Sequence, residues 1–426
     1  MSSYAGIYVN GKEVFTYRNE VFPEVLCLFR RDEFLQVQGR DALPYASNWL
    51  TTGPEELGEE EIEEIEVQAY RTTASVLRDR LNVLGFGEPL VRQVVESLAE
   101  EEVQSKTDLL EHFDDKGIRS QIQQELDNFR DFDYESWKVE VGQHIAAKKE
   151  REQADWRDRG PFSLFEGVDE RVLLRVIVDQ IADDEPIVLD VSELFEGGWM
   201  DSEGNTDEAW QLGLESGANP PIVITEGSYD ARVLQEAIEI LKPHLSGYIR
   251  FLDFEMGNEG SASAAVRTLK SFAAAGISNR IVALFDNDSA AYEAVTSLRG
   301  IKLPPHYAVI HYPDLKLADA YPTLGPQGET VMNVNRLAGS IELYLGTDVL
   351  TTANGNLTPV QWKGYMSKVG AYQGEIMNKG AIQSAFRQKF ESAQGDRKRV
   401  QTQDWSGLAL ILDTLIDVLS TLPSRS

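Results

Sequence analysis

The chain has 426 residues, of which 42% are hydrophobic, so it is long enough for two or three domains with apolar cores. Its formal charge of −30 argues against a general nucleic-acid coat protein, although an acidic protein can still carry a local basic groove. The single cysteine excludes an internal disulfide framework and a zinc–thiolate cluster. We find no apolar run of the ~18 residues that a membrane helix needs, so we expect a soluble cytoplasmic protein.

The first 155 residues are predicted to form a β-plus-helical domain. The opening residues lack the basic start and apolar core of a signal peptide, so we expect no targeting segment. Residues 1–45 are β-rich, with a strong hairpin signal, Asn-Gly, at 10–11. Residues 60–155 carry apolar residues at helical spacing. Residues 55–66 hold eight glutamates and no basic residue, which indicates a solvated linker or helix start, with mimicry of nucleic acid as the alternative.

A change of pattern separates the next two segments. Residues 156–219 are rich in Asp, Glu and Gly, and we interpret them as a connector with some structure around 171–181 and 187–189. From residue 220, short apolar strands alternate with helical segments. The predicted strands and helices are, in chain order, 221–225, 229–241, 247–252, 261–275, 281–285, 289–298 and 307–310. This order predicts a compact parallel sheet flanked by helices, an α/β core.

The rest of the chain is predicted to be a C-terminal helical region, residues 326–426. Segments 331–345, 360–389 and 406–422 have apolar residues at helical spacing. The last segment contains an amphipathic stretch, 408–419, which would be buried within the chain or between protomers. A homo-oligomer is therefore one expectation for the assembly.

Two of the apolar strands stop at acidic residues. Glu226 follows the first predicted strand, and Asp286 and Asp288 follow the third. Residues past the carboxyl ends of parallel strands lie where α/β sheets hold ligands. Like charges this close together are tolerated only around a cation, and oxygen ligands without His or Cys favour Mg²⁺ or Mn²⁺. The sequence therefore predicts a metal site at this edge.

Further residues could extend the site. Asp230 follows Glu226 by one helical turn and either shares its face or is an ordinary partner of the helix dipole. Asp253, after the second strand, would allow a second metal. Glu342 could reach the site from a helix. Backbone amides of the Gly-rich segment 257–263 could hold a phosphate, or the segment is a simple turn with a serine cap.

Residues 361–399 reverse the acidic balance of the chain, with eight basic residues against three acidic ones. Lys363, Lys379 and Arg387 are our candidates for contacts with phosphates of a substrate. Interleaved aromatic residues could stack on nucleobases. They are Trp362, Tyr365, Tyr372, Phe386 and Phe390. The alternative is an amphipathic helix pair with buried aromatic residues and solvated basic residues.

The acidic pattern of residues 220–312 resembles the Toprim domain, the metal-binding α/β fold shared by topoisomerases, bacterial primases and OLD-family nucleases. The Glu of that family matches Glu226, and its Asp-x-Asp matches Asp286 and Asp288. The second acid, Asp230, resembles the OLD branch. The resemblance implies a Mg²⁺-dependent endonuclease that hydrolyses phosphodiesters of DNA or structured RNA. Asp286 and Asp288 would anchor a metal, and Glu226 would bind metal or act as general base.

The whole chain also resembles bacterial HEPN/Toprim-associated proteins, through residues 4–40 and 333–346. That resemblance implies an N-terminal HEPN/Toprim-associated module over 1–155 and a Toprim catalytic domain over 220–325. It also implies an effector of anti-phage defence, alone or with a separate partner protein of the defence system.

Two other chemistries are not expected. HEPN ribonucleases carry an Arg and a His on one helix, separated by four to six residues. Here only Arg299 and His306 have that spacing, and Pro304 and Pro305 between them prevent a helix. We also find no Walker A lysine motif. The alternative function that stays open is a non-catalytic Toprim subunit that binds nucleic acid or a nucleotide, or regulates a larger complex.

Overall fold

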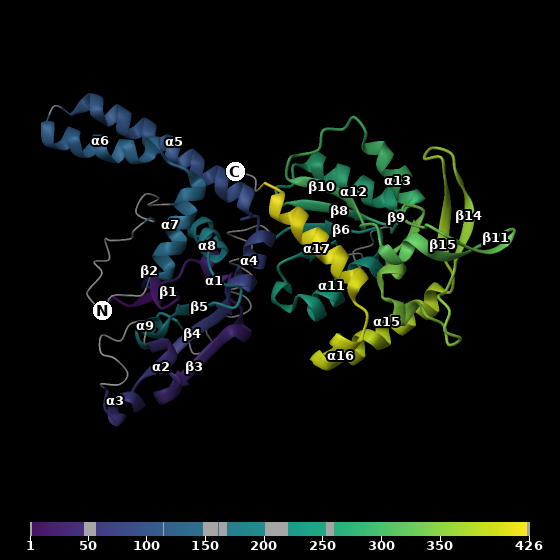
Figure 1. The fold of residues 1–426 in the computed structure, drawn as a ribbon, viewed down its shortest axis with the longest axis horizontal. Helices are drawn as coiled ribbons and strands as arrows, with labels where there is room; N and C mark the ends of the chain where they lie inside the picture. The colour runs from purple at the N-terminus through teal and green to yellow at the C-terminus, as the bar shows by residue number, and fades with distance from the viewer. Residues whose placement is uncertain are drawn as a thin grey trace. The chain divides into compact units, whose positions relative to one another are not determined.

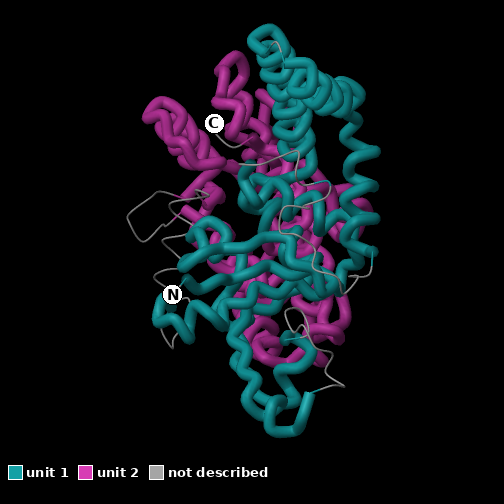
Figure 2. The backbone as a smooth tube through the Cα atoms, turned by 90° about the vertical axis from the view of Figure 1, so that its left-hand side faces the viewer, with its two compact units in different colours: residues 1–218 teal, residues 219–426 magenta. Residues whose placement is uncertain are grey.

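The computed structural model describes residues 2–46, 57–113, 115–147, 161, 168–200, 220–252 and 260–423. The chain forms two compact units, residues 1–218 and 219–426, which Figure 2 shows in teal and magenta. Among the described residues, no helix is both long enough and apolar enough to cross a membrane.

The first unit is built on a five-stranded antiparallel sheet in the order β2-β1-β5-β4-β3. Its strands are β1 (Tyr4–Val9), β2 (Lys12–Arg18), β3 (Phe34–Gln38), β4 (Glu66–Thr73) and β5 (Pro186–Asp190). The hairpin predicted at residues 10–11 is confirmed. Asn10 and Gly11 both have positive φ, as the tight turn between β1 and β2 requires.

Several helices lie beside this sheet (Figure 1), and the prediction of a β-plus-helical N-terminal region is confirmed at that level. The helices are α1 (Pro23–Leu26), α2 (Leu43–Ala46), α3 (Glu59–Glu63), α4 (Ala74–Val83), α5 (Glu88–His112), α6 (Lys116–Arg130), α7 (Tyr134–Ala146), α8 (Glu170–Asp179) and α9 (Ser192–Glu196). The two long helices α5 and α6 pack against each other and extend away from the sheet (Figure 1).

One prediction for this unit needs correction, because strand β4 lies inside segment 60–155, which we predicted to be helical. The structure that we expected within segment 156–219, around 171–181 and 187–189, is confirmed by α8 and β5, although β5 is a strand of the main sheet rather than part of a connector. Residues 67–70 of β4 are all buried, and β4 lies between β3 and β5 in the sheet. Its sequence alternates polar and apolar residues from Glu66 to Ala69, as is typical of a strand, so the predicted helical segment should have excluded it.

The second unit contains a four-stranded parallel sheet in the order β10-β8-β6-β7. Its elements are β6 (Ile222–Ile224), α11 (Ser228–Leu241), β7 (Arg250–Phe251), α12 (Ala262–Ala275), β8 (Ile281–Phe285), α13 (Ser289–Val295) and β10 (Tyr307–His311). The predicted parallel sheet flanked by helices is therefore confirmed. The central strand β8 is buried along its whole length, which explains its unbroken apolar sequence.

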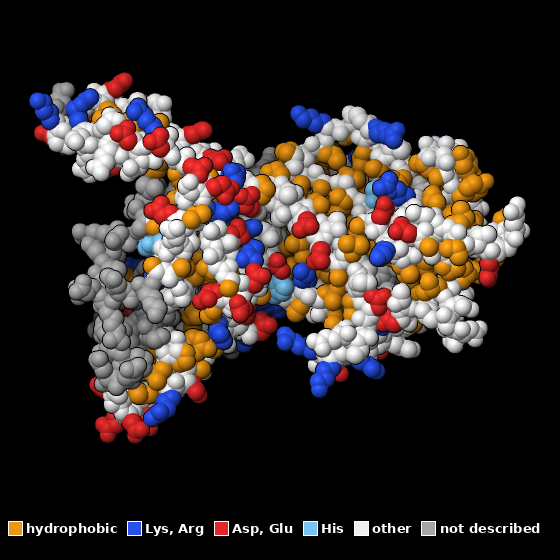
Figure 3. All heavy atoms as spheres, viewed as in Figure 1, with side chains coloured by type: hydrophobic (Ala, Val, Ile, Leu, Met, Phe, Trp, Pro, Cys, Tyr) orange, Lys and Arg blue, Asp and Glu red, His pale blue; other side chains and the backbone are white. Residues whose placement is uncertain are grey.

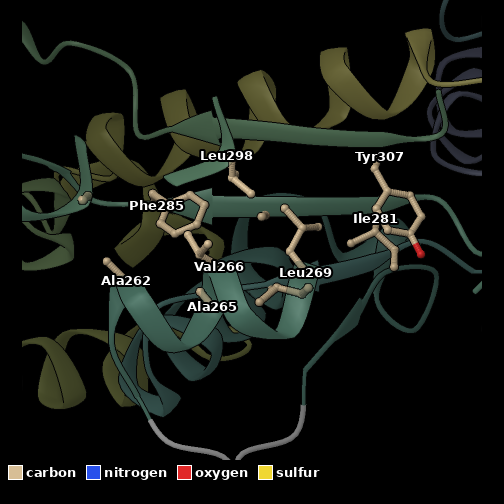
Figure 4. Close-up of a cluster of buried hydrophobic side chains, with 11 residues drawn as sticks. Ala262, Ala265, Val266, Leu269, Ile281, Phe285, Leu298 and Tyr307 are labelled. Atoms are coloured by element: carbon tan, nitrogen blue, oxygen red, sulfur yellow. The ribbon is translucent and has the colours of Figure 1, made fainter. Parts of the chain in front are cut away.

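Helix α12 packs its apolar face on this sheet. Figure 4 shows Val266 and Leu269 of α12 directed at the strand that carries Ile281 and Phe285. Burying one such side chain contributes about 1.5–3 kcal/mol. The packing fixes the central strands, so the residues that follow β6 and β8 begin from well-defined positions.

The prediction of a C-terminal helical region over 326–426 is wrong for its first half. Residues 321–376 contain a second sheet in the order β12-β11-β14-β15, and the short strand β13, which pairs with β9 of the preceding α/β segment. These strands are β9 (Asn287–Asp288), β11 (Tyr321–Gly325), β12 (Gly328–Met332), β13 (Ala338–Gly339), β14 (Val360–Met366) and β15 (Ala371–Ile376). Gly364 and Gly370 explain the error, since glycine weakens a helix, and Gly370 adopts φ +68° in the turn between β14 and β15.

The remaining part of the unit is helical. Its α-helices are α14 (Thr347–Leu350), α15 (Lys379–Ala393), α16 (Arg397–Thr402) and α17 (Ser406–Thr421), and the 3₁₀ helix η8 spans Ile341–Tyr344. Helix α17 confirms the prediction for 406–422 and packs against α11. Leu410 is 38% exposed, but, as the first of the two alternatives predicted, six other apolar residues of this helix are buried within the unit. They are Leu408, Ile411, Leu412, Leu415, Ile416 and Leu419.

Candidate metal centre

The carboxyl ends of two neighbouring strands bring the first two predicted residues together. Strands β6 and β8 are paired with Ile224 opposite Ala283, so both chains leave the sheet at the same edge. Glu226 follows β6 and Asp286 follows β8. The backbone N–H of Asp286 donates a hydrogen bond to Glu226 Oε1 over 2.9 Å. The contact across 60 residues of sequence thus follows directly from the parallel topology.

Both carboxyl groups hold their protons more tightly than usual. Burial, followed by the charges of Asp288 and Asp230, raises the pKa of Glu226 to about 8, although the N–H of Asp286 acts in the opposite direction. Burial and then the charge of Glu226 raise the pKa of Asp286 well above its usual value. Asp286 Oδ1 is buried and has no hydrogen-bond partner among the described residues. Such an acceptor costs about 1–3 kcal/mol, which a cation or a proton would offset.

Asp230 joins the cluster from the first turn of α11. Its Oδ1 accepts a hydrogen bond from the hydroxyl of Tyr312 over 3.3 Å. Burial and then the charge of Glu342 raise the pKa of Asp230 to about 6. Burial, with the charges of Asp230 and Asp286 behind it, raises the pKa of Tyr312 well above its usual value. Tyr312 is therefore a neutral donor at this edge.

Asp288 is held in one orientation by two donors. Its Oδ1 caps α13 by accepting from the N–H of Ala291 over 2.8 Å, and its Oδ2 accepts from Gln373 Nε2 over 2.6 Å. Gln373 Oε1 in turn accepts from the N–H of Ala290 over 2.9 Å. Strand β15 thus positions the second acid of the Asp-x-Asp sequence. Each carboxylate oxygen still has a lone pair free for a cation.

Glu342 also lies at the cluster, as one of its most buried members. It is 3% exposed, and it accepts hydrogen bonds from Ser340 Oγ (2.7 Å) and Gln383 Nε2 (3.0 Å). Lys379 Nζ lies 3.6 Å from Glu342 Oε2. Burial acts to lower the pKa of Lys379, but Glu342 and Asp286 outweigh it, so its pKa lies above the usual value. Lys379 therefore supplies a fixed positive charge beside the carboxyl groups.

The other two predicted cations, Lys363 and Arg387, lie before and after Lys379 in the basic block, residues 361–399. Lys363 pairs with Glu375 over 3.1 Å, and Glu375 lies 3.8 Å from Lys379, so one acidic residue connects Lys363 to the cluster. Arg387 lies about two turns along α15 from Lys379 and pairs with Glu391. We use the name acidic edge for the end of the sheet that carries Glu226, Asp230 and Asp286. The structure brings Lys379 to the acidic edge and leaves Arg387 away from it.

The segment before α12 is only partly described. Asp253 lies outside the described residues, and so do residues 257–259 of the Gly-rich segment. Ser261 Oγ caps α12 by accepting from the N–H of Ala264 over 3.1 Å, as the simple-turn alternative predicted. A Cβ at Gly260 would lie 3.2 Å from the backbone oxygen of Glu226. The described chain therefore returns to the acidic edge at Gly260.

The donor chemistry of the cluster fits a hard divalent cation. Among the described residues, no three His, Cys, Asp or Glu side chains form a ready-made coordination shell. The carboxyl groups are nevertheless close together, because, in addition to burial, the charges of Glu226 and Asp230 raise the pKa of Asp286, and the charge of Asp230 raises the pKa of Glu226. All are oxygen donors, and His311 uses Nδ1 on the backbone oxygen of Asp286, 2.8 Å away. The residues therefore suit Mg²⁺ or Mn²⁺, with side-chain rotation needed to complete a shell.

Strand β13 approaches β9 so closely that we expect Gly339 not to tolerate a larger side chain. A Cβ at Gly339 would lie 2.6 Å from the backbone oxygen of Asn287, between Asp286 and Asp288. We expect Gly339→Ala to lower the free energy of unfolding by about 1–3 kcal/mol, because the backbone must shift. Thermal unfolding tests this, with Gly364→Ala as the control, since a Cβ at Gly364 meets open space. Equal melting temperatures for the two variants would contradict the prediction.

Comparison with known proteins adds one finding. Residues 1–211 match the family model described as HEPN/Toprim N-terminal domain 1. No curated protein and no solved structure matches the chain. The match lies in the first unit and ends before β6. It therefore gives no information about the acidic edge, and the metal site there is inferred only from the positions of its residues.

Proposed function

We propose that this chain is a metal-dependent endonuclease of DNA or structured RNA. The match over residues 1–211 supports that it is a HEPN/Toprim-associated protein. In this proposal residues 220–325 form a Toprim-type catalytic domain. The observation that supports it most is the cluster of Glu226, Asp230 and Asp286, whose pKa values are all raised. A site that only bound a polyanion would be weakened by such a cluster unless a cation neutralised it.

The residues take distinct roles in this proposal. Asp286 and Asp288 would hold Mg²⁺ or Mn²⁺, and Glu226 would bind the same ion or act as general base. When bound, the ion would lower the pKa of a water molecule and neutralise charge on the phosphodiester. Beside a bound cation the pKa of Glu226 would fall below its raised metal-free value, so the ionised carboxylate would be available to bind the ion or to accept a proton. Lys379 keeps its positive charge at this edge and can pair with a phosphate oxygen.

One observation favours the alternative of a non-catalytic binding or regulatory subunit. The described carboxyl groups do not converge on a ready-made coordination shell. In that alternative the acidic edge would hold a cation only together with the phosphates of a nucleotide or nucleic acid. The partner would then be another protein of the same complex. Cleavage of nucleic acid decides between the two functions.

A cleavage screen tests the proposal. The full chain is incubated with single-stranded, duplex and folded DNA and RNA in Mg²⁺, in Mn²⁺ or in EDTA. We expect cleavage of at least one class in the presence of a divalent ion and none in EDTA. Asp413→Asn, which alters an exposed acid of α17, is the control and should cleave like the wild-type protein. Binding without cleavage in every metal would reject the endonuclease and select the binding subunit.

A role in anti-phage defence is the biological part of the proposal. The match of residues 1–211 to a HEPN/Toprim N-terminal domain supports this role, together with the nuclease site proposed for the second unit. In this proposal the nuclease acts on nucleic acid during infection, either alone or under the control of a partner protein. Protection of phage-infected cells by the wild-type protein, measured as a lower number of plaques, should accompany the cleavage activity.

A further inference from the structure

Two tyrosine rings stand exposed on the hairpin of β14 and β15. Tyr365 and Tyr372 are opposite each other in the strand register, and their ring centroids lie 5.1 Å apart at an interplanar angle of 67°. Each residue is 58% exposed. In contrast, Phe386 and Phe390 of the same basic block are buried in the core of the unit. The structure therefore selects two of the aromatic residues as available for contacts with a ligand.

The hairpin is fastened to the loop that carries the acidic residues. Ser289 Oγ donates to the backbone oxygen of Tyr372 over 2.9 Å, and the neighbouring Gln373 binds Asp288. Lys368, in the turn of the hairpin, pairs with Glu293 of α13 over 2.9 Å. The backbone of Tyr372 thus lies within about 10 Å of the carboxyl group of Asp288. A polymer bound at the acidic edge is long enough to span that distance and reach the hairpin.

Strand geometry indicates how a ligand would reach the rings. Gln373 points at Asp288, so Tyr372 points to the opposite face of β15. Strand β15 is the last strand of its sheet and packs beside β13 and α13. A flexible chain that leaves the acidic edge therefore passes around these elements to meet the two rings on the other face of the hairpin.

The charge around the hairpin suits a polyanion. In a chain of charge −30, the hairpin itself, residues 360–376, holds two basic residues, Lys363 and Lys368, and one acidic residue, Glu375. The side chains of Lys363 and Lys368 are 51% and 73% exposed. In Figure 3, hydrophobic side chains gather over the part of the second unit that holds β11, β14 and β15. Exposed rings together with exposed cations match a ligand that has both aromatic bases and phosphates.

We infer that Tyr365 and Tyr372 form a stacking platform for unpaired bases, and that the substrate carries a single-stranded segment beside the phosphodiester at the acidic edge. The location of this substrate rests on the proposed function. Bases inside a duplex are already stacked on one another, so only unpaired bases can use the ring faces. Two rings inclined at 67° offer faces to two bases of a bent single strand.

Binding without metal tests the platform separately from cleavage. Fluorescence anisotropy in EDTA measures the affinity for a short labelled single strand and for a duplex of the same length. We expect the double variant Tyr365→Ala/Tyr372→Ala to bind the single strand about tenfold or more weakly and the duplex with less than about twofold change. Tyr365→Phe/Tyr372→Phe keeps both ring faces and should bind like the wild-type protein. Tyr4→Ala, at a tyrosine 46% exposed in the first unit, is the control.

Three outcomes would overturn the inference. They are unchanged single-strand binding by the alanine variant, an equal loss for single strand and duplex, and a change of oligomeric state, which would make the rings a protein interface. If the wild-type protein cleaves but the alanine variant binds normally, the platform fails and the endonuclease stands. If binding depends on the rings but no metal supports cleavage, the endonuclease fails and the platform stands.

Discussion

Asp286→Asn should reduce metal-dependent cleavage by at least about a thousandfold, which corresponds to about 4 kcal/mol of transition-state stabilisation. The substitution keeps the size of the side chain but removes a negative charge next to Glu226 and Asp230. It also replaces one of the two carboxylate oxygens, of which Oδ1 lacks a partner among the described residues, with an amide nitrogen that does not bind a cation. A divalent cation would lose the central ligand of its site. The stabilisation that such a cation gives to the charge of the transition state is worth several kcal/mol.

Single-turnover cleavage rates at saturating enzyme measure this loss, because they separate chemistry from product release. Asp413→Asn serves again as the exposed-acid control. The same Asp286→Asn protein should show little increase in melting temperature on addition of Mn²⁺, whereas the wild-type protein should be stabilised by about 2.7 kcal/mol at a hundred times the Kd. Cleavage within about tenfold of the wild-type rate would show that Asp286 is not a metal ligand.

The acidic edge could be predicted from sequence because its first residues follow from strand order. A buried strand ends at Phe285, and its parallel neighbour ends at Ile224, so Asp286 and Glu226 had to meet. The same reasoning applied to β10 could have found Tyr312, which directly follows the last residue of that strand. Strand topology alone therefore accounts for the central part of the cluster.

The remaining contacts depend on tertiary packing that no local pattern indicates. Gln373 lies 85 residues from Asp288 in sequence and reaches it only because β15 packs beside α13. Segment 360–376 was predicted as a helix because its apolar residues suit either period, and the glycines of the hairpin decide for strands. The same packing buries Glu342 and brings Lys379 against it. These residues give the cluster its positive charge and its second layer of hydrogen bonds.

Glu226→Gln should stabilise the metal-free protein at pH 8 and have little effect near pH 4. Burial, then the neighbouring charges, raises the pKa of Glu226 from 4.5 to about 8 in the folded protein. The folded state therefore keeps a proton that the unfolded chain releases above about pH 4.5. The stability contributed by this protonated carboxyl group is complete below pH 4.5 and is lost as the pH rises toward 8. A glutamine does not ionise, so it avoids this loss and still accepts the N–H of Asp286.

The expected gain at pH 8 is on the order of 1–3 kcal/mol, since Asp230 and Asp286 titrate in the same cluster and one substitution removes only part of the repulsion. For a unit of this size, that gain raises the melting temperature by roughly 2–10 °C. Thermal unfolding in EDTA from pH 4 to pH 8 measures this gain in stability, with Glu239→Gln on the exposed face of α11 as the control.

Saturating Mg²⁺ should narrow or reverse the difference in melting temperature between Glu226→Gln and the wild-type protein. The cation stabilises the ionised wild-type cluster and binds the variant less well. A variant that is less stable than the wild-type protein at pH 8 in EDTA would mean that Glu226 is already ionised and paired, and the repulsion on which the metal centre depends would be absent.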